Sequence, residues 1–255
     1  MPHSDFIHLH NHTQFSLLDG ACKIKDILDL AKKYNMSSLS ITDHGNLFGA
    51  IEFYNQALNH GIKPIIGCEV YIAPESRFKK TSSSIQGASF HFILLAKDEA
   101  GYANLMKLVS LGYLEGFYYR PRIDKESLSQ YSKGLIGLSS CLKGEIPFLI
   151  QQNRIKEATK AADDFSRIFD KGNFYLELQE NQIPEQRTVN NALIKLSKEL
   201  NLPLVATNDI HYLYKNEARA HETLLCIQTQ TTLDDPNHMR FQTAEFYFKS
   251  PEEMK

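Results

Sequence analysis

Residues 38–73 read SLSITDHGNLFGAIEFYNQALNHGIKPIIGCEVYIA and contain a complete strand–helix–strand unit. The short apolar run at residues 38–42 predicts a buried strand. Residues 47–60 predict a helix that Gly61 closes, and residues 64–73 predict a second strand. Polar residues stand where this unit should be apolar: Asp43 and His44 end the first strand, and Glu69 lies inside the second.

The same alternation continues on both sides of this unit. We expect further strands at residues 6–10, 92–96, 135–139, 174–178 and 204–207, and helices at 24–34, 99–114, 154–169 and 185–200. Strands that alternate with helices predict an α/β fold with a parallel sheet and outer helices. Seven strands in this length favour a closed TIM-like barrel over an open sheet. Residues 75–89 are polar and Ser-rich, which predicts an exposed loop, and residues 118–124 look irregular.

Composition is that of a soluble domain with a sizeable core: 42% of the 255 residues are hydrophobic and the formal net charge is −2. The chain lacks the basic excess of many nucleic-acid-binding proteins, although bound divalent ions would add positive charge. Cys22, Cys68, Cys141 and Cys226 lie far apart without CxxC spacing, so we expect reduced thiols. With no signal peptide and no long apolar run, we expect a cytoplasmic protein without a membrane partner.

Histidines cluster first in HLHNHTQFSLLDG, residues 8–20. Because alternate residues of a strand project to one side, His10 and His12 can converge on one metal ion, and Asp19 follows across a short loop. The alternative is a polar strand face, since a lone HxH is a weak signal.

Two further polar positions belong to the strand–helix–strand unit. The carboxyl end of a barrel strand is where catalytic groups gather, which makes Asp43 and His44 candidates. Alternatively, Asp43 or Asn46 caps the following helix. Burying Glu69 is costly unless the carboxylate binds a metal ion or pairs with a Lys or Arg, and both alternatives stay open.

The remaining candidates follow later strands. Asp209 and His211 alternate after residues 204–207. Cys141 follows the predicted strand at 135–139, although a small buried core cysteine is the favoured alternative there. His91 opens its strand instead of closing it, so the pattern leaves its direction open. The other histidines, His3, His60, His221 and His238, are assigned to surface or capping roles. Imidazoles mixed with carboxylates on one rim suit Zn, Mn or Fe, and more than one ion.

Taken in order, LHNHTQFSLLDG, ITDHGN, GCE, FH, SSC and NDIH resemble the motifs of the polymerase and histidinol phosphatase (PHP) family. The resemblance implies a distorted seven-stranded (β/α)7 barrel with three divalent ions. Asp43, beside His44, is expected to orient an imidazole from outside the ligand set. The implied metal ligands are His10, His12, Asp19, His44, Glu69, His91, Cys141, Asp209 and His211.

Several segments, among them YLEGFYYRPRID and ARAHETLLCIQT, look like the version of this domain at the N-terminus of bacterial replicative DNA polymerases. This resemblance implies a 3'–5' exonuclease that acts on DNA 3' ends, with water activated by the ions as the nucleophile. It implies as partners the rest of the polymerase chain and other replisome subunits. We expect the barrel at residues 1–228 and an extension toward the polymerase core at 229–255. Because the sequence contains no DxD motif, we expect no DNA synthesis by this segment.

Arginines in predicted loops, Arg77, Arg120 and Arg122, are candidates for contacts to the DNA backbone, with ordinary solvated arginines as the alternative. Two other functions compete with the exonuclease. One is a metal-stabilised interaction module of a polymerase without catalysis. The other is a free-standing small-molecule phosphatase, which the polymerase-like segments disfavour.

Overall fold

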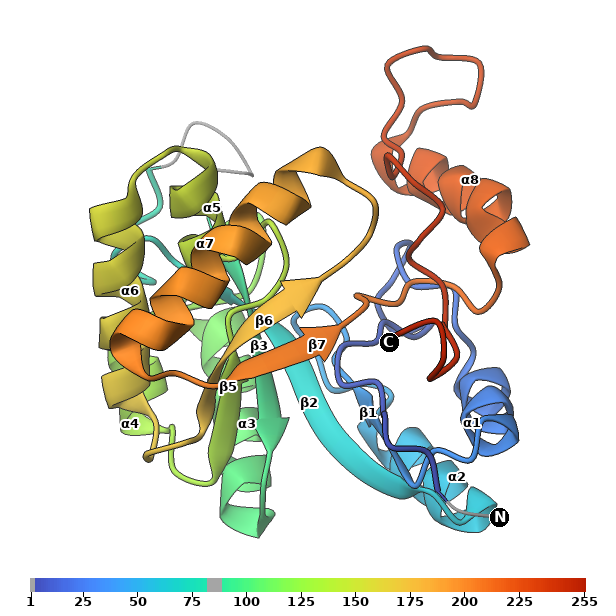
Figure 1. Cartoon of the computed structure of the whole chain (residues 1–255), viewed down its shortest axis with the longest axis horizontal. Helices are drawn as coiled ribbons and strands as arrows, with labels where there is room; N and C mark the ends of the chain where they lie inside the picture. Colours follow the sequence, from blue (N-terminus) through green and yellow to red (C-terminus); the bar gives the residue numbers. More distant parts are fainter. Residues whose placement is uncertain (1–2, 82–88) are drawn as a thin grey trace.

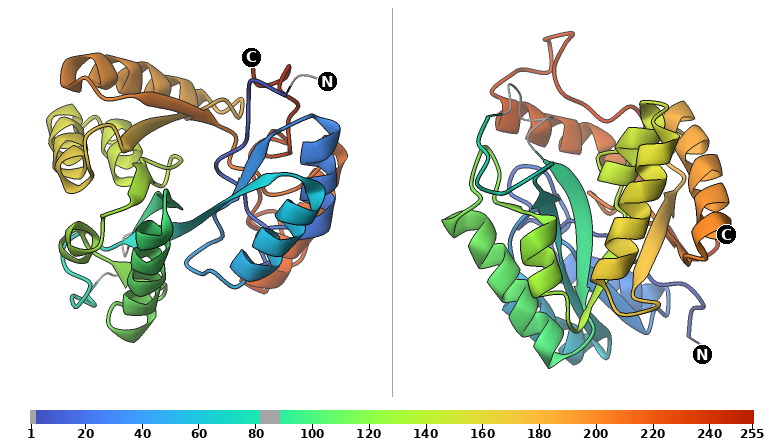
Figure 2. Two further views of the ribbon diagram at one scale, coloured as in Figure 1. Left: turned by 90° about the horizontal axis from the view of Figure 1, so that it is seen from below. Right: turned by 90° about the vertical axis from the view of Figure 1, so that its left-hand side faces the viewer.

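The computed structural model describes residues 3–81 and 89–255. Its centre is a curled, seven-stranded sheet in the order β1-β2-β3-β5-β6-β7, with the short β4 paired to β2 (Figure 1). The strands are β1 (Ser38–Ile41), β2 (Lys63–Ile72), β3 (Phe90–Ala96), β4 (Arg122–Ile123), β5 (Leu135–Leu138), β6 (Phe174–Gln179) and β7 (Leu204–Thr207). This confirms the α/β class, with helices outside a curled sheet (Figure 2). The predicted closed barrel is not confirmed, because in the described part of the chain β1 and β7 stand at the two ends of the strand order and do not pair with each other.

Helices form where apolar side chains recur at helical spacing. In the first helix, Ile24, Ile27, Leu28 and Ala31 are buried on one face, and Asn35 ends the turn with a positive φ of 54°. The helices are α1 (Ile24–Lys33), α2 (Ala50–His60), α3 (Glu99–Leu114), α4 (Lys125–Gln130), α5 (Glu145–Gln151), α6 (Ile155–Ile168), α7 (Pro184–Leu200), the 3-10 helix η1 (Lys215–Glu217) and α8 (Ala218–Thr229). Those predicted at 24–34, 47–60, 99–114, 154–169 and 185–200 are confirmed to within a few residues. The sequence pattern did not predict α4, α5, η1 or α8, and the short β4 lies within residues 118–124, which were predicted to be irregular.

One strand runs against the predicted direction. The pattern predicts a parallel sheet, but β3 is antiparallel to both β2 and β5. A parallel pair needs a long crossover, usually a helix, whereas antiparallel neighbours can be joined by a loop. The connection from β2 to β3 has no helix or strand in its described part, residues 73–81 and 89. The predicted loop at 75–89 is confirmed for those residues only, and 82–88 lie outside the described part.

The predicted strand at residues 6–10 is wrong. Residues 6–10 form no strand, and side chains replace part of a regular ladder. The Asn11 backbone N–H donates to Thr42 Oγ1, and Asn11 Nδ2 donates to the Ser40 carbonyl. The segment lies between two parts of the sheet. Thr42 N–H donates to the Asn11 carbonyl at 2.9 Å, and His12 N–H donates to the Ile210 carbonyl at 2.8 Å. The end of β1 and the residues after β7 are thereby brought to the same short segment.

The chain after α8 folds back onto the body. Asn208 Nδ2 donates to the carbonyls of Glu245 and Tyr247, and Phe248 is buried in the core around α1. Lys255 Nζ lies 2.8 Å from Asp5 Oδ2, so the two ends are neighbours. The domain boundary at residue 228 stays a prediction. Across the described residues, no helix combines the length and the apolar character needed to cross a membrane.

Candidate metal centre

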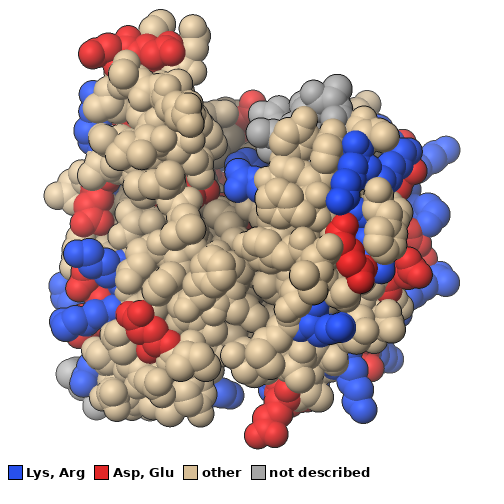
Figure 3. All heavy atoms as spheres, turned by 180° about the vertical axis from the view of Figure 1, so that it is seen from behind, with Lys and Arg blue, Asp and Glu red and all other residues tan. Residues whose placement is uncertain are grey.

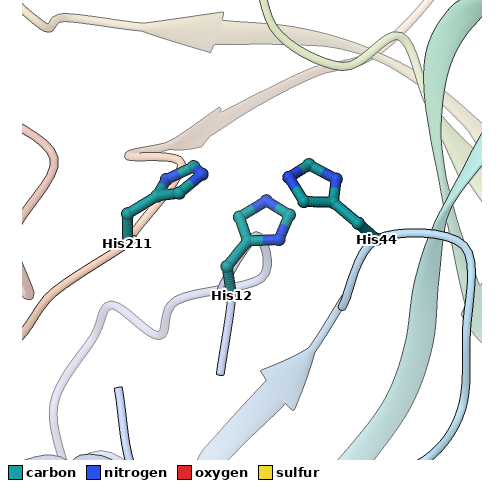
Figure 4. Close-up of side chains that lie close together, drawn as sticks. All are labelled: His12, His44 and His211. Carbon is teal, nitrogen blue, oxygen red and sulfur yellow. The ribbon is translucent and has the colours of Figure 1, made fainter. Parts of the chain in front are cut away.

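Side chains on the inner face of the curled sheet form an apolar layer and, above it, a polar cluster. Along β3, Ile93 and Leu95 contact the inner apolar cluster, and His91 follows on the same face by strand alternation. The polar cluster occupies the end of the sheet where β1, β5 and β7 finish. Figure 4 shows His12, His44 and His211, which come from separate segments, with their rings close together.

His10 and His12 converge as their alternate spacing predicts, and their role as metal ligands stays a prediction. Their Nε2 atoms lie 3.1 Å apart, and both lie 3.2 Å from Asp209 Oδ1. His10 Nδ1 donates to Glu177 Oε1 at 2.7 Å, which leaves Nε2 directed into the cluster. Both rings are fully buried.

Glu69 lies at the centre of the cluster. Its carboxylate oxygens lie 3.6 Å from His10 Nε2, 3.6 Å from His12 Nε2, 2.8 Å from His44 Nδ1 and 3.0 Å from His91 Nδ1. Only 1% of the residue is exposed. The predicted alternative of a pairing with Lys or Arg is wrong, because its near neighbours are imidazoles.

Asp19 closes the other side of the cluster. Its oxygens lie 3.0 Å from His44 Nε2 and 3.7 Å from His211 Nε2. His211 Nδ1 in turn lies 3.6 Å from Asp209 Oδ1. The loop that carries Asp19 and the segment that carries His211 therefore meet, although they are far apart in the sequence.

Cys141 contributes to the wall of the same pocket, which also includes His91, Glu69 and Asp209. Burial raises the pKa of its thiol well above the usual range. Among the described residues, the three-membered groups close enough to share one ion are His12–His44–His211, His10–His12–Glu69 and His44–Glu69–His91. Cys141 is in none of them, so its role as a ligand stays a prediction.

Asp43 acts through Ser16 on the ring of His12. The Asp43 carboxylate accepts hydrogen bonds from Thr13 N–H at 2.7 Å, Thr13 Oγ1 at 2.8 Å and Ser16 Oγ at 2.7 Å. Because the Ser16 hydroxyl proton goes to Asp43, its oxygen accepts from His12 Nδ1 at 3.1 Å. This network holds His12 with Nε2 free for a ligand, as expected of a group that orients an imidazole.

The carboxylates of the cluster hold protons on neighbouring imidazoles. Burial opposes protonation of His10, but Asp209 and Glu177 outweigh it and raise its pKa to about 10. Burial likewise opposes protonation of His44, yet Glu69 is the main cause that raises its pKa to about 9. The negative charge in this volume therefore favours bound cations, and divalent ions can supply that positive charge.

Orphaned buried atoms test whether metal ions fit. Asp19 Oδ1, His44 Nδ1, Glu69 Oε2, His91 Nδ1 and Asp209 Oδ1 are buried, and despite the close contacts given above none of them makes a hydrogen bond with suitable angles. Buried polar atoms without a partner are rare and need an explanation. All five point into one cluster, and a mixture of imidazole nitrogens and carboxylate oxygens is a donor set for Zn, Mn or Fe. The residues present therefore fit a centre of divalent ions.

Besides Ser16, two further residues of the site were not predicted, Glu177 and His221. Glu177 is buried and accepts from His10 Nδ1 and from Thr207 Oγ1. The sequence did contain a signal for Glu177, because burying a carboxylate inside the apolar strand β6 costs as much free energy as burying Glu69 in β2. His221, assigned above to the surface, is only 2% exposed, and its Nε2 donates to the Asp19 carbonyl at 2.8 Å. His238 is also buried, between Asp235 and Glu222.

The three loop arginines differ in their surroundings. Arg122 is 2% exposed and donates to the carbonyls of Gly116 and Lys79, so the predicted DNA contact is wrong for this residue. Arg77 lies 2.7 Å from Glu115 and 3.0 Å from Asp124, so its charge is already engaged. Arg120 lies over the Tyr71 ring, 5.5 Å from its centre, and its contact to DNA stays a prediction.

Comparison with known proteins identifies the family. The family model described as PHP domain matches residues 8–181. The chain belongs to the PHP domain family. This PHP domain is 54% identical over 252 residues to DNA polymerase III subunit alpha of Borreliella burgdorferi and 52% identical over 253 residues to that of Thermus aquaticus. Both matches cover 98% of this chain but only 22% and 21% of those relatives, so the chain spans about a fifth of their length.

Solved structures share the fold of this PHP domain at low sequence identity. A two-domain protein from Bacteroides vulgatus, which contains a predicted PHP-like metal-dependent phosphoesterase, aligns with a TM-score of 0.52 and 16% identity. That match covers 100% of this chain and 64% of the other. A protein from Bifidobacterium adolescentis aligns with a TM-score of 0.51 and 14% identity, covering 80% and 87% of the two chains.

Proposed function

We propose that this PHP domain is a metal-dependent phosphodiesterase that trims DNA from its 3' end as part of a bacterial replicative polymerase. The carrying observation is the position of Glu69 among four imidazoles, with five buried polar atoms of the cluster left without hydrogen bonds. Such a set suits several divalent ions, and the nine residues predicted to hold three of them include Cys141. The likeness to DNA polymerase III subunit alpha supports DNA as the substrate and the rest of that subunit as the partner.

When bound, divalent ions would lower the pKa of a coordinated water and neutralise charge on the phosphate oxygens. Residues of this domain orient the candidate ligands for this role. Glu177 fixes the His10 ring, and the Asp43–Ser16 pair fixes His12, so that both Nε2 atoms face the cluster. The buried floor of the pocket keeps bulk water from these groups, which strengthens electrostatic interactions within it. No side chain is required as the nucleophile.

The test is incubation of the purified chain with a DNA primer labelled at its 5' end, with Mn²⁺ or Zn²⁺ and with chelator. We expect a ladder that shortens from the 3' end with metal and an intact primer with chelator. The double variant His10→Ala/His12→Ala should remain folded by circular dichroism yet leave the primer intact. An intact primer with the wild-type chain, when elemental analysis shows bound metal, would refute the exonuclease and favour a structural module.

A further inference from the structure

The pocket above the metal centre has a second wall that comes from the chain after α8. Met239, Arg240, Phe241 and Gln242 line it together with Asp19, His44 and His211. We call residues 239–242 the strap. Lys143, two positions after Cys141, lines the same pocket from the loop between β5 and α5. The surface in Figure 3 is hollowed between its two halves, with a basic side chain at the edge of the hollow.

Contacts on both sides hold the strap at the pocket. Before it, His238 Nε2 contacts Glu222 of α8, and after it, Thr243 Oγ1 donates to the Asn181 carbonyl at 2.6 Å. Within it, the Phe241 ring packs edge-on against His211 at 4.8 Å between ring centres and lies 4.4 Å from Phe246. Arg240 therefore stands on backbone that is fixed at both ends.

Lys143 is placed in the same way. Its carbonyl accepts a hydrogen bond from His91 N–H at 3.0 Å, which fixes its backbone next to the candidate ligand. Both Lys143 and Arg240 have exposed side chains. Over residues 3–81 and 89–255, neither side chain forms a hydrogen bond or an ion pair. By contrast, Arg77 pairs with Glu115, and Arg122 donates to the Gly116 carbonyl.

Two uncommitted cations at the mouth of a pocket whose floor is anionic are suited to a ligand with more than one negative charge. The metal centre would bind one phosphate, the scissile one. A nucleic-acid strand carries a further phosphate one nucleotide away, and Arg and Lys are the usual phosphate partners. We propose that Arg240 and Lys143 bind the phosphate adjacent to the scissile one, so that the site selects a strand over a phosphomonoester. This inference rests on the proposed function and names its substrate.

The test uses fluorescence anisotropy with the Mn²⁺-loaded, 255-residue chain and a fluorescein-labelled thymidine trinucleotide. A phosphorothioate at the 3'-terminal linkage slows hydrolysis. A second trinucleotide has a neutral methylphosphonate at the inner linkage. The variant Arg240→Ala/Lys143→Ala is compared with the control Arg187→Ala/Lys195→Ala, which removes the same charge from the exposed surface of α7. Because both double variants lose two positive charges, their net charges are equal, and a difference in binding between them reports local contacts.

We expect the Arg240→Ala/Lys143→Ala variant to bind the charged trinucleotide about tenfold more weakly than the wild type, since hydrogen bonds to charged groups are strong. With the neutral inner linkage, the variant and the wild type should bind equally, because the contact is already lost. The control should match the wild type on both. For the Arg240→Ala/Lys143→Ala variant, the slope of log affinity against log salt concentration should be less steep than that of the wild type by about 0.7 for each lost contact.

Equal binding by the Arg240→Ala/Lys143→Ala variant and the wild type would overturn the proposal. So would an equal loss on both trinucleotides, because the cations would then contact something other than the inner phosphate. A wild-type chain that binds neither trinucleotide would overturn it together with DNA as the substrate. If the wild type binds as expected but never cleaves the unmodified primer, the exonuclease fails while the phosphate contact stands.

Discussion

Glu69 and His91 meet across two antiparallel strands, with Glu69 Oε1 3.0 Å from His91 Nδ1. In the register of β2 and β3, Glu69 stands opposite Ile93 and His91 opposite Tyr71, so the two polar residues are diagonal neighbours on one face. His91 begins β3, but β3 runs against its neighbours. Its first residues therefore reach the same rim at which β1 and β5 end.

Glu69 is the residue whose loss should change metal content most. We expect Glu69→Gln to hold at least one divalent ion fewer per chain than the wild type, because a neutral amide is a poorer ligand at the centre of the cluster. Metal content after dialysis, measured by mass spectrometry, checks this. Glu199→Gln on the exposed side of α7 is the control. Equal metal content in all three proteins would remove Glu69 from the ligand set.

Ser16 joins three partners, so its hydroxyl should matter more than its size suggests. It donates to Asp43 and accepts from His44 N–H and His12 Nδ1. Ser16→Ala removes one hydrogen bond from Asp43 and leaves His12 Nδ1 and His44 N–H without this acceptor, and we expect the free energy of unfolding to fall by about 2 kcal/mol. Urea denaturation measures it, with the exposed Ser110→Ala as the control. A change as small as that of the control would contradict the network described here.

His221 should influence metal affinity without being a ligand. It donates to the Asp19 carbonyl at 2.8 Å and lies 3.8 Å from Asp19 Oδ1. Loss of such a supporting contact commonly weakens metal binding by about 10- to 100-fold. We expect that loss in His221→Ala, a recovery in His221→Gln, which retains a donor, and no change in His60→Ala. Competition with a chromophoric chelator gives the affinities. Equal affinities for the two alanine variants would leave His221 with a packing role only.

The metal-stripped chain should be most stable near neutral pH. Burial lowers the pKa of His8 and His221 to about 4 and that of His12 to about 3, so the stability they contribute is lost as pH falls below the unfolded value of about 6.5. The raised pKa values of His10 and His44, about 10 and about 9, contribute stability that is lost as pH rises from about 6.5 through those values. Urea denaturation in chelator at several pH values checks this. A steady rise from acid to alkaline pH would contradict the charge balance of the cluster.

Local patterns predicted most of the helices and strands, because burial of one face is encoded within each segment. The direction of β3 was not predicted, since it depends on pairing with strands distant in the sequence. A usable signal existed, namely the lack of a helical pattern between β2 and β3. The wrong strand at residues 6–10 has a similar cause: Asn11 and Thr42 use side chains where a ladder would use backbone.

Most of the candidate site was predictable because its residues follow strand ends that meet at one rim. Asp209 and His211 follow β7 in this way, whereas His10 and His12 lie in a segment that is not a strand and were predicted from their alternate spacing. His91 was undecided from the pattern alone and is explained by the reversed β3. His221 had no local signal, because its contact with Asp19 arises only when α8 packs across the loop that carries that residue.

The most direct test of the metal centre is anomalous X-ray diffraction from crystals of the zinc-loaded chain, recorded on both sides of the zinc absorption edge. We expect more than one anomalous peak inside the pocket, with the Glu69 carboxylate between two of them and His10, His12 and His91 within coordinating distance. It would also show whether Cys141 coordinates. Peaks confined to surface histidines such as His60, with none beside Glu69, would contradict the account.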